Sequence, residues 1–224
     1  MVKILVGDGR LVIKPFESHA TVLDTYYLWT GMNGLELWKQ GDKRGVLVDE
    51  HAVIARVSFT SDLAKACGIT KTQRPEIVDV MAGFGVDGAT LALLGAQVEC
   101  WEILPGVALM AQDLLVRCGV EHVAVQCLNS WLALSENETD VVYLDPMFEL
   151  TGRTALAGKR MQYLEKLAGT GAYRVAQWIE KAAPMARDRV VVKRHLRDQP
   201  TPAPDWQIIG KKVRFDIYRG QSGN

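Results

Sequence analysis

The sequence lacks the features that define several protein classes. Lys and Arg total 26 of its 224 residues and Asp and Glu also total 26, so the formal net charge is zero. This balance excludes a histone-like polycation and a disordered acidic tail, but a local basic patch for nucleic acid remains compatible with it. No apolar run approaches the roughly 20 residues of a transmembrane helix. Residues 1–7 have no signal-peptide core and instead predict a strand. We therefore expect no membrane association.

Cysteine is scarce, and none of the cysteines forms a C-x-x-C pair. The four are Cys67, Cys100, Cys118 and Cys127. The histidines show no metal-like spacing either, so we expect no metal site. Cys100 and Cys127 lie inside apolar strand-like runs, where a thiol serves as a small hydrophobic group. Structural thiols of this kind are typical of a reducing compartment, which predicts a cytoplasmic protein.

Apolar residues make up 48% of the chain, which is enough to bury a core. From about residue 76 onward, strand-like runs alternate with helical patterns. The expected strands are 77–81, 97–102, 122–127, 140–145, 189–193, 206–211 and 213–218, and the expected helices are 88–94, 105–118, 154–167 and 172–186. This alternation predicts an α/β fold with a mainly parallel, doubly wound sheet.

The first 70 residues follow a different pattern, with short apolar runs that glycines interrupt. The pattern predicts a small β-rich lobe with strands at 46–48 and 52–55, followed by a helix at 62–67. We therefore divide the chain into an N-terminal lobe, residues 1–70, and a ligand-binding domain, residues 71–224.

A glycine-rich loop follows the first strand of the α/β region. Gly83, Gly85 and Gly88 satisfy the pattern G-x-G-x-x-G. Glycines permit a tight turn and a close ligand, and the following helix offers free N–H groups. Ordinary turns also use such glycines, and both a dinucleotide and S-adenosylmethionine fit the loop. Asp79 and Asp87 favour S-adenosylmethionine, because carboxylates attract its cationic groups and would repel a pyrophosphate.

Acidic residues also end the second and fourth strands of this region. Glu102 suits the ribose hydroxyls of either cofactor class. The fourth strand ends in the tetrad that runs from Asp145 through Pro146 and Met147 to Phe148. Asp145 and a carbonyl near Pro146 would accept the hydrogens of an exocyclic amine and aim its lone pair, while Phe148 would stack on the base, a contact worth about 1–3 kcal/mol. The tetrad favours amine methylation over hydride transfer. We predict Asp145, Pro146 and Phe148 as the catalytic residues.

Together these segments resemble class I methyltransferases, and in particular the RsmJ family of ribosomal small-subunit RNA guanine-N2 methyltransferases. The matching segments are 78–87, 141–148, 189–194 and 214–218, and weaker similarity covers 35–220. The resemblance implies a seven-stranded Rossmann-like class I fold. It also implies methyl transfer from S-adenosylmethionine to the N2 amine of a guanine in 16S ribosomal RNA, as RNA or within the small ribosomal subunit.

The resemblance further implies a set of cofactor-binding residues at the ends of the first four parallel strands. They are Asp79, Ala82, Gly83, Phe84, Gly85, Asp87, Glu102, Ile103, Asn129, Ser130 and Asp145.

Basic residues at the fifth strand supply candidate RNA contacts. We expect Lys193, Arg194 and Arg197 to bind RNA phosphates, although a solvated surface would show the same pattern. Two other functions stay open. An NAD-dependent oxidoreductase predicts nicotinamide-dependent reduction and tolerance of substitution at Asp145. A non-catalytic RNA-binding assembly factor predicts RNA affinity without methyl transfer. Nothing in the sequence points to an oligomeric state.

Overall fold

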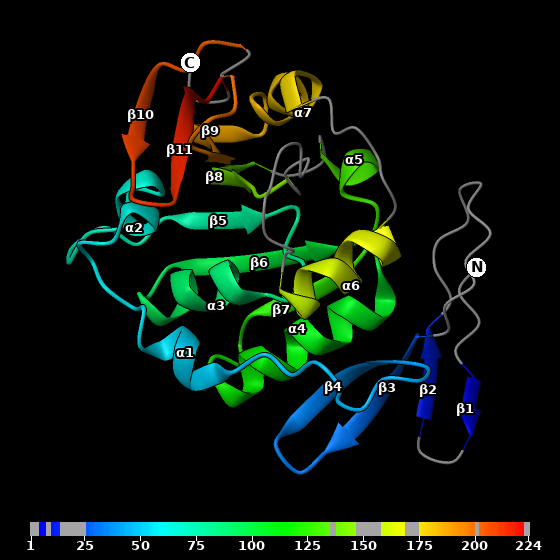
Figure 1. The fold of residues 1–224 in the computed structure, drawn as a ribbon. Helices are drawn as coiled ribbons and strands as arrows, with labels where there is room; N and C mark the ends of the chain where they lie inside the picture. Colours follow the sequence, from blue (N-terminus) through cyan, green and yellow to red (C-terminus); the bar gives the residue numbers. More distant parts are fainter. Residues whose placement is uncertain are drawn as a thin grey trace.

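The computed structural model of this chain describes residues 5–7, 10–13, 26–134, 138–146, 158–168, 175–199 and 202–221. Within those residues the strands form a four-stranded sheet near the N-terminus and a seven-stranded sheet that dominates the molecule (Figure 1). No helix in the described part of the chain combines the length and the apolar composition needed to cross a bilayer.

The large sheet has the strand order β10-β11-β9-β8-β5-β6-β7. Its strands are β5 (Glu76–Asp79), β6 (Gln97–Glu102), β7 (Ala124–Cys127), β8 (Thr139–Leu144), β9 (Ala186–His195), β10 (Trp206–Ile209) and β11 (Val213–Arg219). Strands β5 to β9 run parallel, and β11 lies antiparallel between β9 and β10. The predicted doubly wound α/β sheet is confirmed. Because β6 and β8 flank β5, the chain order reverses at β5, and ligands bind beyond the carboxyl ends of strands at such a point.

Alternate residues of β8 face two different core layers. Val141 and Tyr143 pack in one apolar cluster, and Val142 and Leu144 pack in the other. The first layer contains α3 (Val86–Leu93), α4 (Pro105–Arg117) and α6 (Lys159–Ala168), and the second contains α5 (Ser130–Ala133) and α7 (Val175–Ala182). Figure 1 shows these two helical layers on opposite sides of the sheet. Such a strand is buried on both faces, which explains its continuous β-branched sequence.

The small sheet is an antiparallel meander that packs against the helices of the first layer. Its strands are β1 (Leu5–Gly7), β2 (Arg10–Ile13), β3 (Tyr26–Gly31) and β4 (Gly34–Lys39). The backbone N–H of Leu35 in β4 donates to Asp113 of α4 at 3.1 Å. The ring of Tyr26 meets Tyr163 of α6 edge-on, with 5.1 Å between ring centroids. The predicted β-rich N-terminal element is therefore present and docked on the large domain.

Two short helices follow the small sheet. The predicted helix at 62–67 is confirmed as α2 (Asp62–Ala66), and it packs on β10 and β11. Helix α1 (Glu50–Ile54) packs on α3. The division of the chain at residue 70 stays a prediction.

Three local predictions from the sequence are wrong. The strand expected at 52–55 lies mainly in α1, because the Asp49 side chain caps this helix by accepting the N–H of His51 at 3.0 Å. Only Val46 of the expected strand 46–48 pairs, in an isolated bridge with Leu37. The helix expected to reach residue 186 ends as α7 at Ala182, where a turn leads into β9.

The cysteines divide by their place in the sheet. Cys67, Cys100 and Cys118 are buried. Cys127 is exposed, contrary to the role expected of it, because β7 is an edge strand. In the described part of the chain, no three His, Cys, Asp or Glu side chains gather as metal ligands would.

Helix α3 approaches β6 so closely that only glycine fits at position 88. A Cβ on Gly88 would lie 2.5 Å from the buried Sγ of Cys100. Overpacking costs about 1–3 kcal/mol, whereas alanine in a helix gains about 1 kcal/mol over glycine, so we expect Gly88→Ala to lower the free energy of unfolding by up to about 2 kcal/mol. Urea denaturation measures this free energy. The double variant with Cys100→Ala should lose less than the sum of the single losses. A Gly88→Ala variant more stable than the wild type would contradict this account of the packing.

Candidate active site

The loop between β5 and α3 owes its shape to two glycines. Gly83 and Gly85 have φ of 53° and 75°, in the left-handed region that favours glycine. Gly85 is also the residue that begins α3, and a Cβ there would lie 3.0 Å from the Cβ of Ala111 in α4. The loop therefore turns tightly between β5 and α3.

Glu102 ties the end of β6 to this loop. Its carboxylate accepts the N–H of Gly83 at 2.9 Å and the N–H of Leu104 at 2.8 Å. Burial raises the pKa of Glu102 to about 7, although its backbone hydrogen bonds act in the opposite direction. The residue therefore titrates near neutral pH beside the glycine loop.

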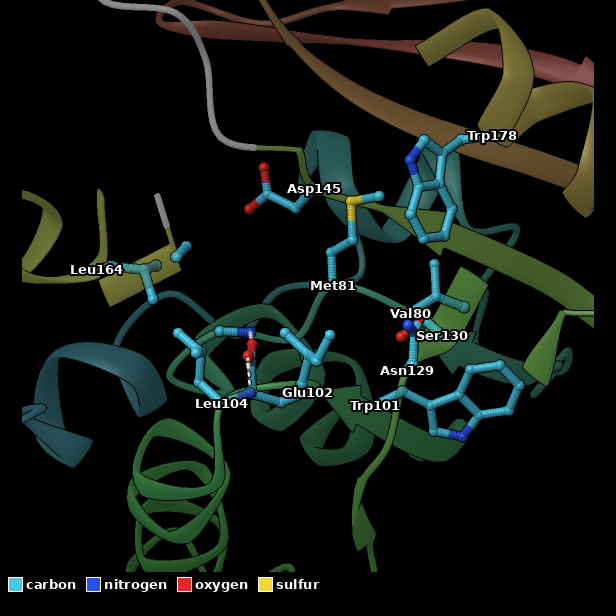
Figure 2. A pocket seen from close by; sticks show the side chains of 13 residues that line it. Val80, Met81, Trp101, Glu102, Leu104, Asn129, Ser130, Asp145, Leu164 and Trp178 are labelled. Carbon is cyan, nitrogen blue, oxygen red and sulfur yellow. Dashed lines mark hydrogen bonds between the residues drawn. The ribbon is translucent and has the colours of Figure 1, made fainter. Parts of the chain in front are cut away.

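A first cavity of about 150 Å³ opens beyond the carboxyl ends of β5, β6 and β8. Figure 2 shows Glu102 and Asp145 facing it from the ends of β6 and β8, with apolar walls around them. Its lining residues are Val80, Met81, Gly83, Trp101, Glu102, Ile103, Leu104, Asn129, Ser130, Asp145, Leu164, Ala168 and Trp178. Six of these were predicted from the sequence as cofactor residues: Gly83, Glu102, Ile103, Asn129, Ser130 and Asp145.

A second cavity of about 190 Å³ adjoins the first. The two share Met81, Gly83, Asp145 and Leu164 as walls. The second is also lined by Arg56, Asp79, Ala82, Phe84, Val86, Asp87, Pro146, Arg160, Met161 and Lys193. It therefore gathers five more of the predicted residues, Asp79, Ala82, Phe84, Asp87 and Pro146, whereas the predicted Gly85 lines neither cavity. Asp145 stands between the two cavities.

A lysine bridges two carboxylates at the second cavity. The Nζ of Lys193 donates to Asp87 at 2.6 Å and to Asp145 at 2.7 Å. The hydroxyl of Tyr143 donates to the same Asp87 oxygen at 2.7 Å. These side chains come from α3, β8, the residue after β8, and β9.

The bridge sets the charge states of its members. Burial raises the pKa of Asp145 to about 6, while the charge of Lys193 acts against that rise. For Asp87 burial also acts upward, but the charge and hydrogen bond of Lys193 outweigh it and lower the pKa. The pKa of the buried Asp79 is raised well above its ordinary value, first by burial and then by the charges of Asp87 and Asp145.

The residues predicted to bind RNA lie in three different settings. Lys193 belongs to the bridge and lies inside the site. Arg194 is buried, and its Nε lies 3.6 Å from an oxygen of the buried Asp216, which argues against a phosphate contact there. Arg197 is exposed in the turn after β9. Phe148, predicted to stack on the base, lies outside the described residues.

Sequence reasoning missed the bridge between Asp87 and Asp145. Tyr143 was not among the predicted site residues, and Lys193 was expected to bind RNA phosphates. The signal was the sheet register: Tyr143 pairs with Val191, so Asp145 and Lys193, each two residues further on, emerge side by side. Arg56 and Arg160 were not among the predicted site residues.

Comparison with known proteins agrees with this geometry. A family model described as "Putative SAM-dependent methyltransferase" matches residues 14–220. The "Ribosomal RNA small subunit methyltransferase J" of Alkalilimnicola ehrlichii is 35% identical over 97% of this chain and 89% of its own length. That of Thioalkalivibrio sulfidiphilus is 38% identical over 73% of this chain and 70% of its own. This chain belongs to that family of S-adenosylmethionine-dependent methyltransferases.

Solved structures share the fold of this methyltransferase. The SAM-dependent methyltransferase NGO1261 from Neisseria gonorrhoeae superposes with a TM-score of 0.65 at 27% identity, covering 92% of this chain and 88% of that one. An RNA methyltransferase from Salinibacter ruber in complex with S-adenosylhomocysteine superposes with a TM-score of 0.51 at 16% identity, covering 78% of this chain and 93% of that one, and shows the fold alone. The family supports the methyltransferase hypothesis over the oxidoreductase and the non-catalytic assembly factor.

The first cavity of this methyltransferase fits its cofactor. A carboxylate at the end of β6 suits ribose hydroxyls, and apolar walls beside Ile103 and Asn129 suit an adenine ring. Gly83 of the glycine loop lines both cavities, at their junction. When bound, S-adenosylmethionine supplies an electrophilic methyl carbon on a sulfonium.

Cofactor affinity should depend on the ionisation of Glu102. Because its pKa is about 7 in the free protein, the carboxylate that accepts ribose hydrogen bonds is formed as pH rises through 7. We therefore expect affinity for S-adenosylhomocysteine to increase between pH 6 and 8, by at most about tenfold per unit below 7. Calorimetric titration measures it. Glu102→Gln should bind more weakly and without this rise, while exposed Glu121→Gln should behave as wild type. A wild-type slope in Glu102→Gln would contradict the assignment.

Proposed function

We propose that this enzyme transfers the methyl group of S-adenosylmethionine to the N2 amine of a guanine in small-subunit ribosomal RNA. The observation that carries the proposal is the position of Asp145, which lines both cavities at the end of β8. A cofactor in the first cavity and a base in the second would meet at this carboxylate. The names of the two relatives specify ribosomal RNA of the small subunit, which supports this RNA as the substrate class.

In this proposal Asp145 orients the amine. The N2 lone pair of guanine is conjugated with the ring, so the amine is a weak nucleophile. A hydrogen bond from the amine to Asp145, and another to a backbone carbonyl near Pro146, would hold the nitrogen in line with the methyl carbon. As the N–C bond forms and the S–C bond breaks, the amine becomes acidic. Asp145, with a pKa of about 6, can then take its proton.

Lys193 positions Asp145 through their hydrogen bond. Its ammonium keeps the carboxylate ionised in a buried site and restricts its rotamers through the 2.7 Å hydrogen bond. In-line positioning then supplies most of the acceleration, since direct transfer needs no covalent enzyme intermediate.

The proposal extends to the setting of the enzyme. It places the protein in the cytoplasm, with ribosomal RNA or the small ribosomal subunit as partner, and it requires neither a metal nor a membrane. It assigns the cofactor to residues 71–224 and the N-terminal lobe to residues 1–70.

Replacement of the carboxylate tests the chemistry directly. We expect Asp145→Asn to reduce kcat by about 10²- to 10⁴-fold, because the amide cannot accept the proton, while S-adenosylhomocysteine still binds. The assay is radiolabelled methyl transfer to small subunits that lack the modification, followed by nucleoside mass spectrometry. N2-methylguanosine is the expected product. A different methylated nucleoside, or full activity of Asp145→Asn, would overturn the proposal.

The bridge predicts a shifted pH profile. The charge of Lys193 holds down the pKa of Asp145, so Lys193→Met should raise it and protonate the carboxylate at higher pH. We expect the acidic limb of kcat to move up by about one pH unit or more, with the loss larger at pH 6 than at pH 8. Lys193→Arg, which keeps the charge, should keep the limb near its wild-type position. An equal loss at every pH would indicate a purely structural role.

A further inference from the structure

Two arginines from distant parts of the chain converge on the second cavity. Arg56 follows α1, and Arg160 lies in the first turn of α6. Both line the second cavity and neither lines the first, where the residues that suit adenosine lie. Pro146, on the substrate side of Asp145, shares the same cavity.

Arg160 has no ion-pair partner among the residues that the structure describes. Within the described ranges no carboxylate lies within 4.0 Å of its guanidinium, although the side chain is partly buried. The pKa of Arg160 is lowered, first by burial and then by the charge of Arg56, with Asp87 acting in the opposite direction. The guanidinium of Arg160 is therefore partly desolvated and is repelled by the exposed Arg56.

The nearby carboxylates are already engaged. One oxygen of Asp87 accepts from Lys193 and Tyr143, and its other oxygen lies 4.0 Å from Arg56. Asp145 accepts from Lys193. Asp79 is buried at the end of β5, and one of its oxygens accepts the N–H of Met81 at 3.3 Å. Arg160 is therefore left at the cavity wall without an ion-pair partner among the described residues, where an anion would neutralise its charge.

We infer that Arg56 and Arg160 form a phosphate subsite, which binds a backbone phosphate of the RNA nucleotide whose base enters the second cavity. The planar guanidinium fork matches phosphate oxygens in pairs, and a partly buried arginine such as Arg160 binds a phosphate more strongly than a solvated one. The identity of the base rests on the proposed function, whereas the phosphate subsite rests on the arginines. The contact would fix the register of the RNA, and Asp145 would select the amine.

Kinetics on small subunits test the subsite. We expect Arg160→Gln and Arg56→Gln each to raise KM for the subunit by about tenfold. Each should also make the slope of log(kcat/KM) against log salt concentration shallower by about one, because one phosphate contact is lost. Arg160→Lys, which keeps the charge, should lose less. Lys71→Gln removes one exposed charge from the loop before β5, at the amino ends of the parallel strands and so opposite the site, and should change neither quantity. Thermal melting verifies that each variant is folded.

The carboxylate of the cofactor could supply the anion instead of an RNA phosphate. The affinity of each variant for S-adenosylhomocysteine distinguishes these two sources. Unchanged affinity in Arg160→Gln supports the phosphate subsite. A loss of affinity equal to the rise in KM would assign the arginines to the cofactor and overturn the inference. An unchanged KM and salt dependence in Arg160→Gln would also overturn it.

Competition by nucleotides separates this inference from the proposed function. With the protein saturated in S-adenosylhomocysteine, we expect GMP to compete with the subunit better than guanosine does, and Arg160→Gln to abolish that advantage. The same comparison with AMP and adenosine tests the base. A phosphate advantage without a guanine preference would contradict the guanine proposal and keep the subsite. A guanine preference without a phosphate advantage would overturn the subsite alone.

Discussion

The ammonium of Lys193 between Asp87 and Asp145 holds the site together. Without a cation, buried carboxylates at the ends of β5 and β8 and in α3 would repel one another, and burial alone would favour their protonated forms. The distances of 2.6 and 2.7 Å show that the lysine is fully engaged with both partners. This bridge links a helix, a strand and the loop beyond β8. It includes Asp145, the carboxylate that lines both cavities.

The glycine loop, held by Glu102, forms a second boundary between the two cavities through Gly83. The carboxylate of Glu102 accepts the N–H of Gly83 and so holds the loop against the end of β6. The left-handed conformation of Gly83 and Gly85 then turns the chain into α3, which brings Asp87 to the lysine. A change in the ionisation of Glu102 would therefore change the strength of its hydrogen bond to Gly83, in the loop that lines both cavities.

The N-terminal segment contributes to the site and is more than a covering layer. Tyr26 packs on Tyr163 in α6, three residues beyond Arg160, and the small sheet is anchored to α4 through Leu35 and Asp113. The segment that leaves this sheet forms α1 and brings Arg56 to the second cavity. Docking of the small sheet thus stabilises the helix whose first turn supplies the second arginine.

The sequence by itself determined the parallel sheet, the glycine loop, Glu102 and the strand end at Asp145, because these features follow from local patterns of apolar residues, glycines and strand-terminal carboxylates. Helix α1 escaped prediction because the cap at Asp49 outweighs the apolar run after it. Only the tertiary structure decided that Lys193 faces Asp87 and Asp145, which lie 106 and 48 positions away in the chain. It likewise decided that Arg194 is buried against Asp216 and that Arg56 and Arg160 line the same cavity. A charge reveals its partner only when strand register and helix docking set the distance between them, and neither is encoded in a local pattern.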